Sequence, residues 1–256
     1  MSKRYNSTEM IHILLPAYNE EKALGSVIAG VVHALPDGGF RIWVVDDGSS
    51  DGTADVARKR GAAGAPVVLL RHGVNRGLGQ AFRTGLAAIL PALADSDILV
   101  TMDSDDTHPP SLIPDLVRAI VEGRADLAIA SRFAPGGREV GVPLVRRVLS
   151  AGARVVFRAF FPLPGVKDYT CAYRAILGKV VRQGVERWGT LVTEDGFASS
   201  VEMLLRLAAG KPRIVELPLV LRYDRKPGPS KMRVFATVRR TLAVLARLRR
   251  IRSARG

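Results

Sequence analysis

The chain has 256 residues, of which 47% are apolar, and carries a formal net charge of +14 at pH 7. This size suits a single α/β domain with one substantial hydrophobic core. The one cysteine, Cys171, excludes an intramolecular disulfide framework and fits a reducing compartment. The N-terminal residues do not form the apolar stretch of a signal peptide, and no uncharged apolar run is long enough to span a membrane. We therefore expect any membrane association to be peripheral.

The positive charge is concentrated at the C-terminal end. Residues 225–256 contain eleven Lys and Arg and no Asp or Glu. From 234 to 252, apolar residues recur at helical spacing beside arginines, which is the composition of a helix lying in a membrane interface. A helix packed on the rest of the chain and a solvated basic face are the alternatives. We expect residues 1–231 to form the main domain and residues 232–256 a basic amphipathic tail.

The first half alternates apolar runs with amphipathic stretches bounded by turn residues, a pattern typical of strand–helix units in a parallel sheet. The apolar runs predict strands at 11–15, 41–45, 67–70 and 98–102, and the helical spacing predicts helices at 21–35, 54–60 and 77–93. The second half is less regular, with a strand expected at 126–130 and a helix at 144–161. The sequence therefore predicts an α/β fold with a mostly parallel central sheet flanked by helices.

Polar clusters follow three of the predicted strands directly. They occupy residues 16–20, 46–53 and 103–110. Ligands of open parallel sheets bind at the carboxyl ends of the strands, where helix N-termini offer free N–H groups. We therefore expect the three clusters to form one site at a shared edge of the sheet.

The third cluster is rich in carboxylates. Because strand side chains alternate, we expect Asp103 and Asp105 to project to the same side, and two like charges so close are costly unless a cation lies there. A hard divalent ion, Mg²⁺ or Mn²⁺, is the natural partner of such oxygen ligands. A solvated acidic turn ended by Pro109 and Pro110 is the alternative.

In their order along the chain, these motifs resemble the nucleotide-sugar transferases of glycosyltransferase family 2, and specifically the polyprenyl-phosphate (dolichyl-phosphate) mannosyl or glucosyl synthases. The resemblance covers roughly residues 10–231. Besides the three clusters it rests on Gly77-Leu78-Gly79, Ala81, Gly85, Ser131, Arg132, Asp168, Thr170, Arg174, Glu202, Arg225, Gly228, Ser230 and Lys231. It implies a GT-A type fold over residues 1–231, a Rossmann-like nucleotide-binding sheet whose aspartate pair holds a divalent metal.

The resemblance also implies roles for individual residues. Those expected to contact the nucleotide sugar are Pro16, Tyr18, Asn19, Glu20, Asp46, Asp47, Gly77, Asp103 and Ser104. Asp103 and Asp105 are expected on the metal, and Asp105 and Arg132 in catalysis. The acceptor phosphate is expected at Arg132, Arg147, Ser150, Arg225 and Lys231, with Asp168, Arg174 and Glu202 in support.

This chain departs from the family pattern at two places. Thr107 stands where many members carry a Gln that contacts the metal. Residues 171–173, Cys-Ala-Tyr, replace the usual Ser-Gly-Phe, on the side where the acceptor is expected.

A phosphate acceptor would explain the arginines of the second half. A lipid phosphate has a second pKa of about 6, so near pH 7 it is largely ionised and already a nucleophile. It needs no strong base, but it needs cations that overcome its repulsion from an anionic donor, and Arg binds phosphate bidentately. The resemblance implies inverting transfer of mannose or glucose, from GDP-mannose or UDP-glucose, to polyprenyl phosphate on the cytoplasmic side of a membrane.

Two other functions remain open from the sequence. A sugar hydroxyl acceptor would need a carboxylate base, and Glu194 or Asp195 could serve. Outside the enzymes, the basic composition would suit a nucleic-acid-binding protein. However, no basic patch is interleaved with aromatic residues, and the aspartates would repel phosphates without a metal, so we expect no nucleic-acid partner.

Overall fold

The computed structural model describes residues 9–36, 39–196 and 198–225. The strands are β1 Ile11–Ala17, β2 Phe40–Asp46, β3 Val67–Arg71, β4 Ile98–Thr101, β5 Leu127–Ser131, β6 Arg138–Val140, β7 Arg174–Leu177, β8 Ile214–Pro218 and β9 Val220–Arg222. The α-helices are α1 Glu21–Ala34, α2 Thr53–Ala62, α3 Leu78–Ile89, α4 Ile113–Val121, α5 Leu144–Phe160, α6 Gly178–Trp188 and α7 Ala198–Ala208. Two short 3₁₀ turns complete them, η1 Pro110–Leu112 and η2 Tyr223–Arg225.

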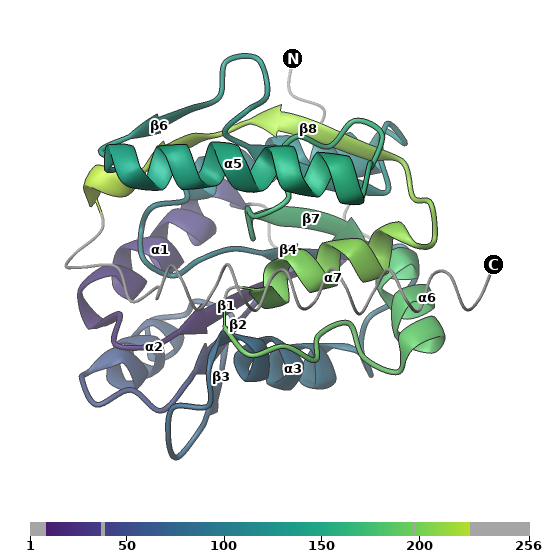
Figure 1. The fold of residues 1–256 in the computed structure, drawn as a ribbon. Helices are drawn as coiled ribbons and strands as arrows, with labels where there is room; N and C mark the ends of the chain where they lie inside the picture. Colours follow the sequence, from purple (N-terminus) through teal and green to yellow (C-terminus); the bar gives the residue numbers. More distant parts are fainter. Residues whose placement is uncertain (1–8, 37–38, 197, 226–256) are drawn as a thin grey trace.

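The central sheet has the strand order β3-β2-β1-β4-β7-β5-β8 (Figure 1). All neighbouring pairs are parallel except those of β7, which runs antiparallel to both β4 and β5. Strands β2 and β3 lie on one side of β1, and the chain then returns to place β4 on the other side. In open α/β sheets such a reversal of strand order leaves a crevice at the carboxyl ends of the two strands.

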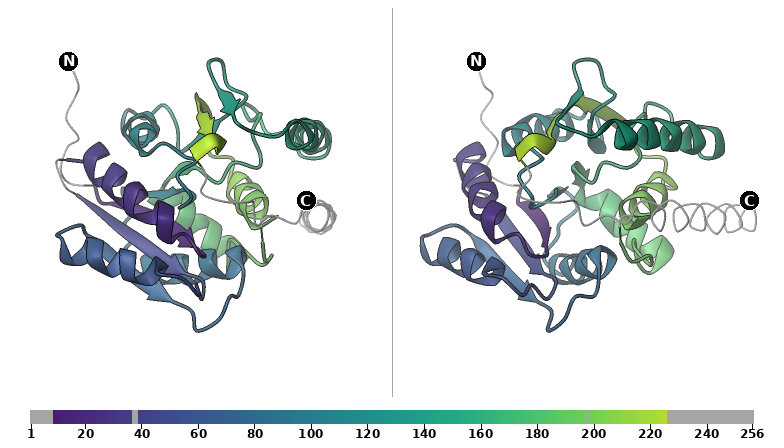
Figure 2. Two further views of the ribbon diagram at one scale, coloured as in Figure 1. Left: turned by 90° about the vertical axis from the view of Figure 1, so that its left-hand side faces the viewer. Right: turned by 60° about the vertical axis from the view of Figure 1, so that its left-hand side comes forward.

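Helices cover both faces of the sheet (Figure 2). On one face, Ile13, Leu15 and Val100 pack with buried residues of α1 and α4. On the other, Leu14 and Leu99 pack with buried residues of α3, α6 and α7. Because successive strand residues point to opposite faces, the continuous apolar runs of β1 and β4 are what a sheet covered on both sides requires.

The predicted fold class is confirmed, and the predicted strands and helices appear within a few residues of their expected ends. The elements that were not predicted are β6, β7, β8, β9, α4, α6 and α7. Strand β7 has four residues and begins with Arg174, so no apolar run marks it. The two-stranded sheet of β6 and β9 joins segments about 80 residues apart, which no local pattern can indicate.

The end of the chain is outside the described residues. This applies to Lys231 and to the predicted tail at 232–256, so the division into a domain and a tail stays a prediction. Among the helices that the structure does describe, none combines the length and the apolar character needed to cross a bilayer.

A glycine lets two loops meet at the start of α3. A Cβ atom on Gly79 would lie 1.7 Å from the backbone oxygen of Glu194, in the loop between α6 and α7. That loop can therefore lie on the first turn of α3 only because residue 79 has no side chain.

We expect Gly79→Ala to lower the free energy of unfolding by about 1–3 kcal/mol, because backbone rather than a flexible side chain must move. Urea denaturation followed by circular dichroism measures this change. Gly61→Ala on α2 is the matched control, since the nearest atom to its Cβ lies at 3.8 Å, and we expect it to be neutral or slightly stabilising. Equal effects of the two substitutions would contradict this account of Gly79.

Candidate active site

Direct contacts join the carboxyl ends of β1 and β4, where the strand order of the sheet reverses. Ser104 Oγ donates a hydrogen bond of 2.7 Å to the carbonyl oxygen of Pro16, and the amide of Met102 donates to the carbonyl of Leu14 at 3.3 Å. Ser104 is buried. The first and third polar clusters of the sequence therefore meet at one edge of the sheet, as predicted.

The first and second clusters are also joined. The amide of Asn19 donates to Ser49 Oγ at 2.9 Å, and Asn19 Oδ1 accepts from the amide of Ser50 at 2.9 Å. The amide of Glu20 donates to Thr53 Oγ1 at 2.8 Å. Asn19 has a φ of +52°, which the short Asn side chain tolerates better than most. Tyr18, half-buried, lies at this junction.

Asp46 and Asp47 at the end of β2 are buried and shape the neighbouring loops. Asp46 accepts the amide of Ser49 at 3.0 Å and lies 3.1 Å from Arg71 Nε. Asp47 accepts the amides of Arg76 and Gly77 at 2.9 and 2.8 Å. Its Oδ1 also lies 2.6 Å from His72 Nδ1.

Both oxygens of Asp47 therefore bind the loop before α3, whereas the resemblance implied a contact of Asp47 with the nucleotide sugar. Gly77, with a φ of +91°, ends that loop and begins α3. Because Gly77 has no side chain, its expected contact with the nucleotide sugar would be made by its backbone.

The acidic loop, residues 103–106, differs from the expected geometry in one respect. Strand β4 ends at Thr101, so strand alternation does not reach Asp103 and Asp105. The side chain of Asp103 is 33% exposed, whereas Asp105 is 9% exposed and its Oδ1 accepts the hydroxyl of Thr107 at 2.6 Å. The two carboxylates therefore have different environments rather than equivalent places on one strand face.

His108 connects the acidic loop to Tyr173. Its Nδ1 accepts the amide of Asp103 at 3.1 Å, and its ring stacks on Tyr173 with 5.2 Å between the centroids. Tyr173 in turn donates to the carbonyl of Pro109 at 3.0 Å. His108 therefore braces the acidic loop against Tyr173.

The residues present fit a hard divalent cation. Within the described part of the chain, no group of three or more His, Cys, Asp and Glu side chains is placed to hold a metal. Asp103 and Asp105 would supply two carboxylates, and a donor diphosphate with water would supply the other oxygens, as Mg²⁺ sites at phosphates often do. Thr107 stands at the position of the family's Gln, and its hydroxyl donates a hydrogen bond to Asp105.

Burial and neighbouring charges shift the pKa of Asp106 in the acidic loop. Burial raises the pKa of Asp106, Arg225 lowers it, Asp105 raises it and Arg222 lowers it, with a net rise. The amide of Arg222 donates to the carbonyl of Thr107 at 3.0 Å, which brings η2 beside the loop. Arg225 therefore lies at the rim of the crevice, on the side where the acceptor phosphate was expected.

Arg132 is held by carboxylates. Its Nε and Nη2 donate to the two oxygens of Asp168 at 2.8 and 2.7 Å, and its Nη1 donates to Glu139 at 3.1 Å. Burial raises the pKa of Asp168, but the charge and hydrogen bonds of Arg132 outweigh it, so this pKa lies below its usual range. Arg132 thus ties the end of β5 to β6 and to the turn before β7.

This arrangement differs from the role in which Arg132 grips the acceptor phosphate, because two carboxylates already occupy the guanidinium. Asp168, which was expected in a supporting role, is the main partner of this guanidinium. Glu139 was not predicted, since nothing in the sequence indicates that β6 folds back onto β5.

Arg174 and Glu202 lie in the interior. Arg174 is fully buried and donates to the carbonyls of Ser200 and Tyr169 at 2.6 and 2.9 Å, and burial lowers its pKa to about 10. Glu202 accepts the amides of Thr193 and Glu194 at 2.7 and 2.8 Å. Both side chains are therefore used to hold backbone groups inside the protein.

The loop held by Glu202 carries the alternative bases. Asp195 pairs with Arg83 of α3 at 2.7 Å, and the backbone of Glu194 lies against Gly79. Of the remaining predicted acceptor residues, Ser150 is half-buried on α5. Arg147 is on the same helix, but its side chain is outside the described part of the structure.

A reversal of strand order beside β1, with an acidic loop at the carboxyl ends of the strands, is typical of nucleotide-binding folds of the Rossmann-like class. The sequence matches the model of Glycosyl transferase family 2 over residues 12–187, and the chain therefore belongs to that family. The sequence-based recognition of the family is confirmed, and with it the assignment as a glycosyltransferase.

Two curated relatives cover most of the chain. The dolichol-phosphate mannosyltransferase of Pyrococcus furiosus is 33% identical over 225 residues, which are 87% of this chain and 59% of that protein. The chain therefore spans little more than half the length of that relative. The undecaprenyl-phosphate mannosyltransferase of Micrococcus luteus is 34% identical over 219 residues, 86% of each protein.

The fold is that of a solved glycosyltransferase. Glucosyl-3-phosphoglycerate synthase from Mycobacterium tuberculosis, in a structure with Mn²⁺, UDP and glucosyl-3-phosphoglycerate, aligns with a TM-score of 0.68 and 24% identity. The alignment covers 93% of this chain and 79% of that one. This likeness shows the GT-A fold and confirms the predicted fold type.

The thiol of Cys171 should be unreactive towards thiol reagents in the folded protein. Burial and the charge of Asp168 raise the pKa of its thiol to about 12, so the thiolate is only about 10⁻⁴ of the population at pH 8. We expect negligible reaction with Ellman's reagent in buffer and release of one equivalent per chain in denaturing urea. Fast reaction of the native protein would contradict the buried placement.

Arg132→Ala should destabilise the fold, because it leaves Asp168 buried without its cation. We expect a loss of about 3–5 kcal/mol in the free energy of unfolding, measured by urea denaturation. Arg118→Ala is the control, since the Arg118–Asp115 pair on α4 is exposed and should be worth at most about 1 kcal/mol. If both variants unfold alike, Arg132 is not the structural tie described above.

Proposed function

We propose that this chain transfers a hexose, mannose or glucose, with inversion from a nucleotide sugar to polyprenyl phosphate. The observation that carries the proposal is the acidic loop with Arg225 beside it, since together they offer a place for a metal-bound diphosphate and a cation for a second phosphate. The guanidinium of the neighbouring Arg222 is already paired with Asp224 at 2.7 Å. The names of the two curated relatives support a lipid-phosphate acceptor and favour mannose.

The donor would lie across the carboxyl ends of β1, β2 and β4. Asn19 and Glu20 are fixed by their bonds to the second cluster, so they would meet the nucleoside with little reorganisation. The free N–H groups at the start of α3, after Gly77, would face the anionic part of the donor. GDP-mannose and UDP-glucose are the donors to test.

Asp103 and Asp105 would hold Mg²⁺ or Mn²⁺, which when bound neutralises charge on the departing diphosphate. The hydrogen bond from Thr107 fixes the orientation of Asp105. The Mn²⁺ and UDP in the structure of the mycobacterial synthase support this assignment.

An ionised acceptor phosphate can react without a base. One of its oxygens would form a bond to the anomeric carbon while the bond from that carbon to the diphosphate oxygen breaks, and the electron pair leaves with the nucleoside diphosphate. Displacement from the opposite side inverts the anomeric centre. Arg225 would reduce the repulsion between the two anions, and Arg147 and Lys231 remain proposed acceptor contacts.

The acceptor's chemistry also suggests where the enzyme works. Polyprenyl phosphate is held in a membrane, and nucleotide sugars are found in the cytoplasm, so we place the reaction at the cytoplasmic face, with the enzyme bound peripherally.

We expect Asp105→Ala to reduce transfer at least about a hundredfold without unfolding the protein, because it removes one of the two metal carboxylates. The assay follows radiolabel from GDP-mannose and from UDP-glucose into solvent-extractable polyprenyl phosphate, with Mg²⁺ or Mn²⁺ and with chelator. Asp115→Ala, an exposed carboxylate on α4, is the matched control and should retain full activity. Full activity of Asp105→Ala would refute the metal assignment.

The same assay separates the two acceptor classes. Metal-dependent label in the lipid fraction would support the proposal and identify the donor. Metal-dependent release of nucleotide without lipid label would instead favour a hydroxyl acceptor, with Glu194 or Asp195 as the base to test next.

A further inference from the structure

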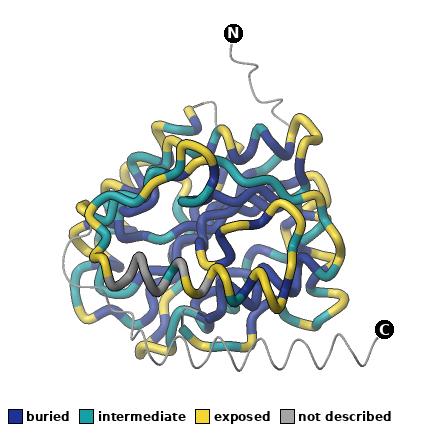
Figure 3. Tube along the Cα trace, turned by 45° about the horizontal axis from the view of Figure 1, so that its top comes forward, coloured by how far each residue is buried: buried dark blue, intermediate teal, exposed yellow. Residues whose placement is uncertain are grey.

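The loop between β3 and α3 has a histidine as its one buried residue. Arg71 and residues 73–76 are exposed, and even the apolar Val74 is 69% exposed, whereas His72 is buried. In Figure 3 the buried residues lie mainly in the central strands, and exposed residues are found mainly in the helices and loops around them. A polar side chain buried in such a loop needs hydrogen-bond partners. The proposed transfer assigns no role to His72.

The side chain of His72 joins two elements that face the proposed donor. Its Nδ1 lies 2.6 Å from Asp47 Oδ1 after β2, and its Nε2 lies 2.9 Å from Thr84 Oγ1 on α3. A carboxylate only accepts hydrogen bonds, so Nδ1 carries the hydrogen and Nε2 is left for the hydroxyl of Thr84. The imidazole therefore ties the end of β2 to the second turn of α3.

The chain of hydrogen bonds continues along α3. Arg83 donates from Nε and Nη2 to Gln80 Oε1 at 3.0 and 2.8 Å, and from Nη2 to Asp195 Oδ1 at 2.7 Å. Because a guanidinium only donates, the amide nitrogen of Gln80 is free to donate to Thr84 Oγ1, at a longer 3.4 Å. Each donor in this chain meets an acceptor when the hydroxyl of Thr84 donates to Nε2 of His72.

The loop that His72 holds lies against the second polar cluster. Gly48, with a φ of +70°, has no side chain, and a Cβ atom there would overlap the backbone carbonyl carbon of Val74. Asp47, the partner of His72, also accepts two amides at the end of this loop. The loop then leads into α3, whose first N–H groups are proposed to face the anionic part of the donor. His72 thus acts on both ends of the segment that would meet the donor.

We propose that His72 is a positioning residue for the nucleoside diphosphate part of the donor, and that Thr84 acts through it. His72 touches no reacting atom. It holds the loop and the start of α3 in the arrangement that binds the donor, so that binding does not have to order them. The inference rests on the proposed nucleotide-sugar donor, and it adds two residues that lie outside the three polar clusters.

Nucleotide affinity tests the proposal without the transfer reaction. The full chain with Mg²⁺ is titrated with GDP and with UDP by isothermal titration calorimetry. If losing the bond leaves the loop in its binding arrangement in about a tenth of the molecules, the Kd rises about tenfold. We expect this rise for His72→Phe and for Thr84→Val, which replaces the hydroxyl by a methyl group.

Thr84 also gives a rescue and a second route to the test. Thr84→Ser keeps the hydroxyl and should bind nucleotide like the wild type, whereas a rise equal to that of Thr84→Val would overturn the proposal. Thr84 is half-buried, so Thr84→Val carries the test even if His72→Phe does not fold.

The two residues should not have independent effects, because they act through one hydrogen bond. The double variant His72→Phe/Thr84→Val should bind nucleotide no more weakly than the weaker single variant. Independent effects would instead multiply to about a hundredfold. A hundredfold loss in the double variant would contradict the role of Thr84 as a partner of His72.

A second buried histidine separates positioning from loss of stability. His12 accepts a hydrogen bond of 3.1 Å from Trp43 Nε1, near the opposite end of β1 from the polar cluster. His12→Phe should lower the free energy of unfolding, measured by urea denaturation, but leave the nucleotide Kd within about twofold. If His12→Phe and His72→Phe raise the Kd alike, general destabilisation explains the effect and the proposal fails.

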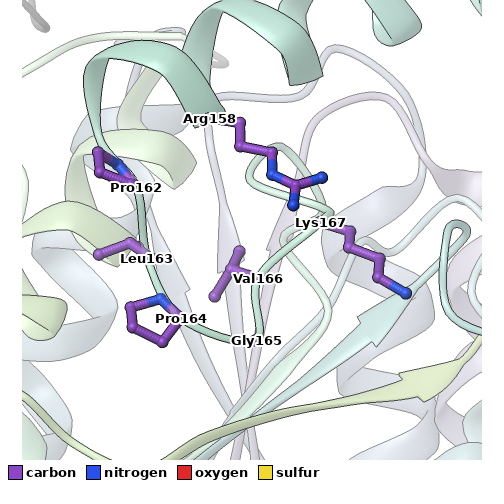
Figure 4. A pocket seen from close by; sticks show the side chains of 7 residues that line it. All are labelled: Arg158, Pro162, Leu163, Pro164, Gly165, Val166 and Lys167. Carbon is purple, nitrogen blue, oxygen red and sulfur yellow. The ribbon is translucent and has the colours of Figure 1, made fainter.

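A distant arginine controls for charge. Arg158 lines a pocket at the C-terminal end of α5 (Figure 4). The amide of Lys167 in that pocket donates to Glu216 of β8, which is the edge strand opposite β3. Arg158→Gln removes a positive charge there and should not change the Kd. A rise as large as that of His72→Phe would mean that affinity follows net charge and would overturn the proposal.

The transfer assay distinguishes this inference from the proposed function. His72→Phe should raise the KM for the nucleotide sugar more than it lowers kcat, and a lower kcat at unchanged KM would overturn the positioning role. If the wild type binds GDP or UDP and His72→Phe binds it equally well, only the inference fails. If the wild type binds neither nucleotide, the proposed nucleotide-sugar donor is refuted, and the inference with it.

Discussion

The concentration of negative charge after β4 is the constraint on which the rest of the site depends. Three aspartates lie within residues 103–106. Asp105 is nearly buried, and burial, with a smaller contribution from the charge of Asp105, raises the pKa of Asp106. The protein keeps this loop in place with neutral and cationic partners, namely the hydroxyl of Thr107, the ring of His108 and the nearby charges of Arg222 and Arg225. The loop is thus organised before any ligand arrives, which lowers the cost of ordering it on binding.

Much of the arrangement could be predicted from the sequence. The apolar runs gave the strands, and the rule that ligands bind at the carboxyl ends of parallel strands placed the clusters at 16–20, 46–53 and 103–110 on one rim. The rule can be applied once the strands are recognised from their local apolar patterns. The hydrogen bond from Ser104 to the carbonyl oxygen of Pro16 shows that the first and third clusters do meet. Helices α1, α2, α3 and α5 were predicted in the same way, because their spacing is local, whereas α4, α6 and α7 were not predicted.

What could not be predicted depends on pairs of residues far apart in the chain. Arg132 meets Asp168, 36 residues later, and Arg174 meets the carbonyl of Ser200, 26 residues later. From the sequence alone, each arginine is a cation available to phosphate, because composition does not reveal which arginines find partners inside the protein. The same holds for Asp47, whose backbone donors are 29 and 30 residues away.

The antiparallel strand β7 has a consequence for how the chain acquires its fold. Strands β4 and β5 do not touch each other directly, since β7 lies between them and pairs with both. During synthesis, β4 and β5 both emerge before β7, so each has an unpaired edge until residues 174–177 follow. Such edges are the places at which partly folded chains associate with one another. The late insertion of one four-residue strand therefore decides when the two halves of the sheet become a single cooperative unit.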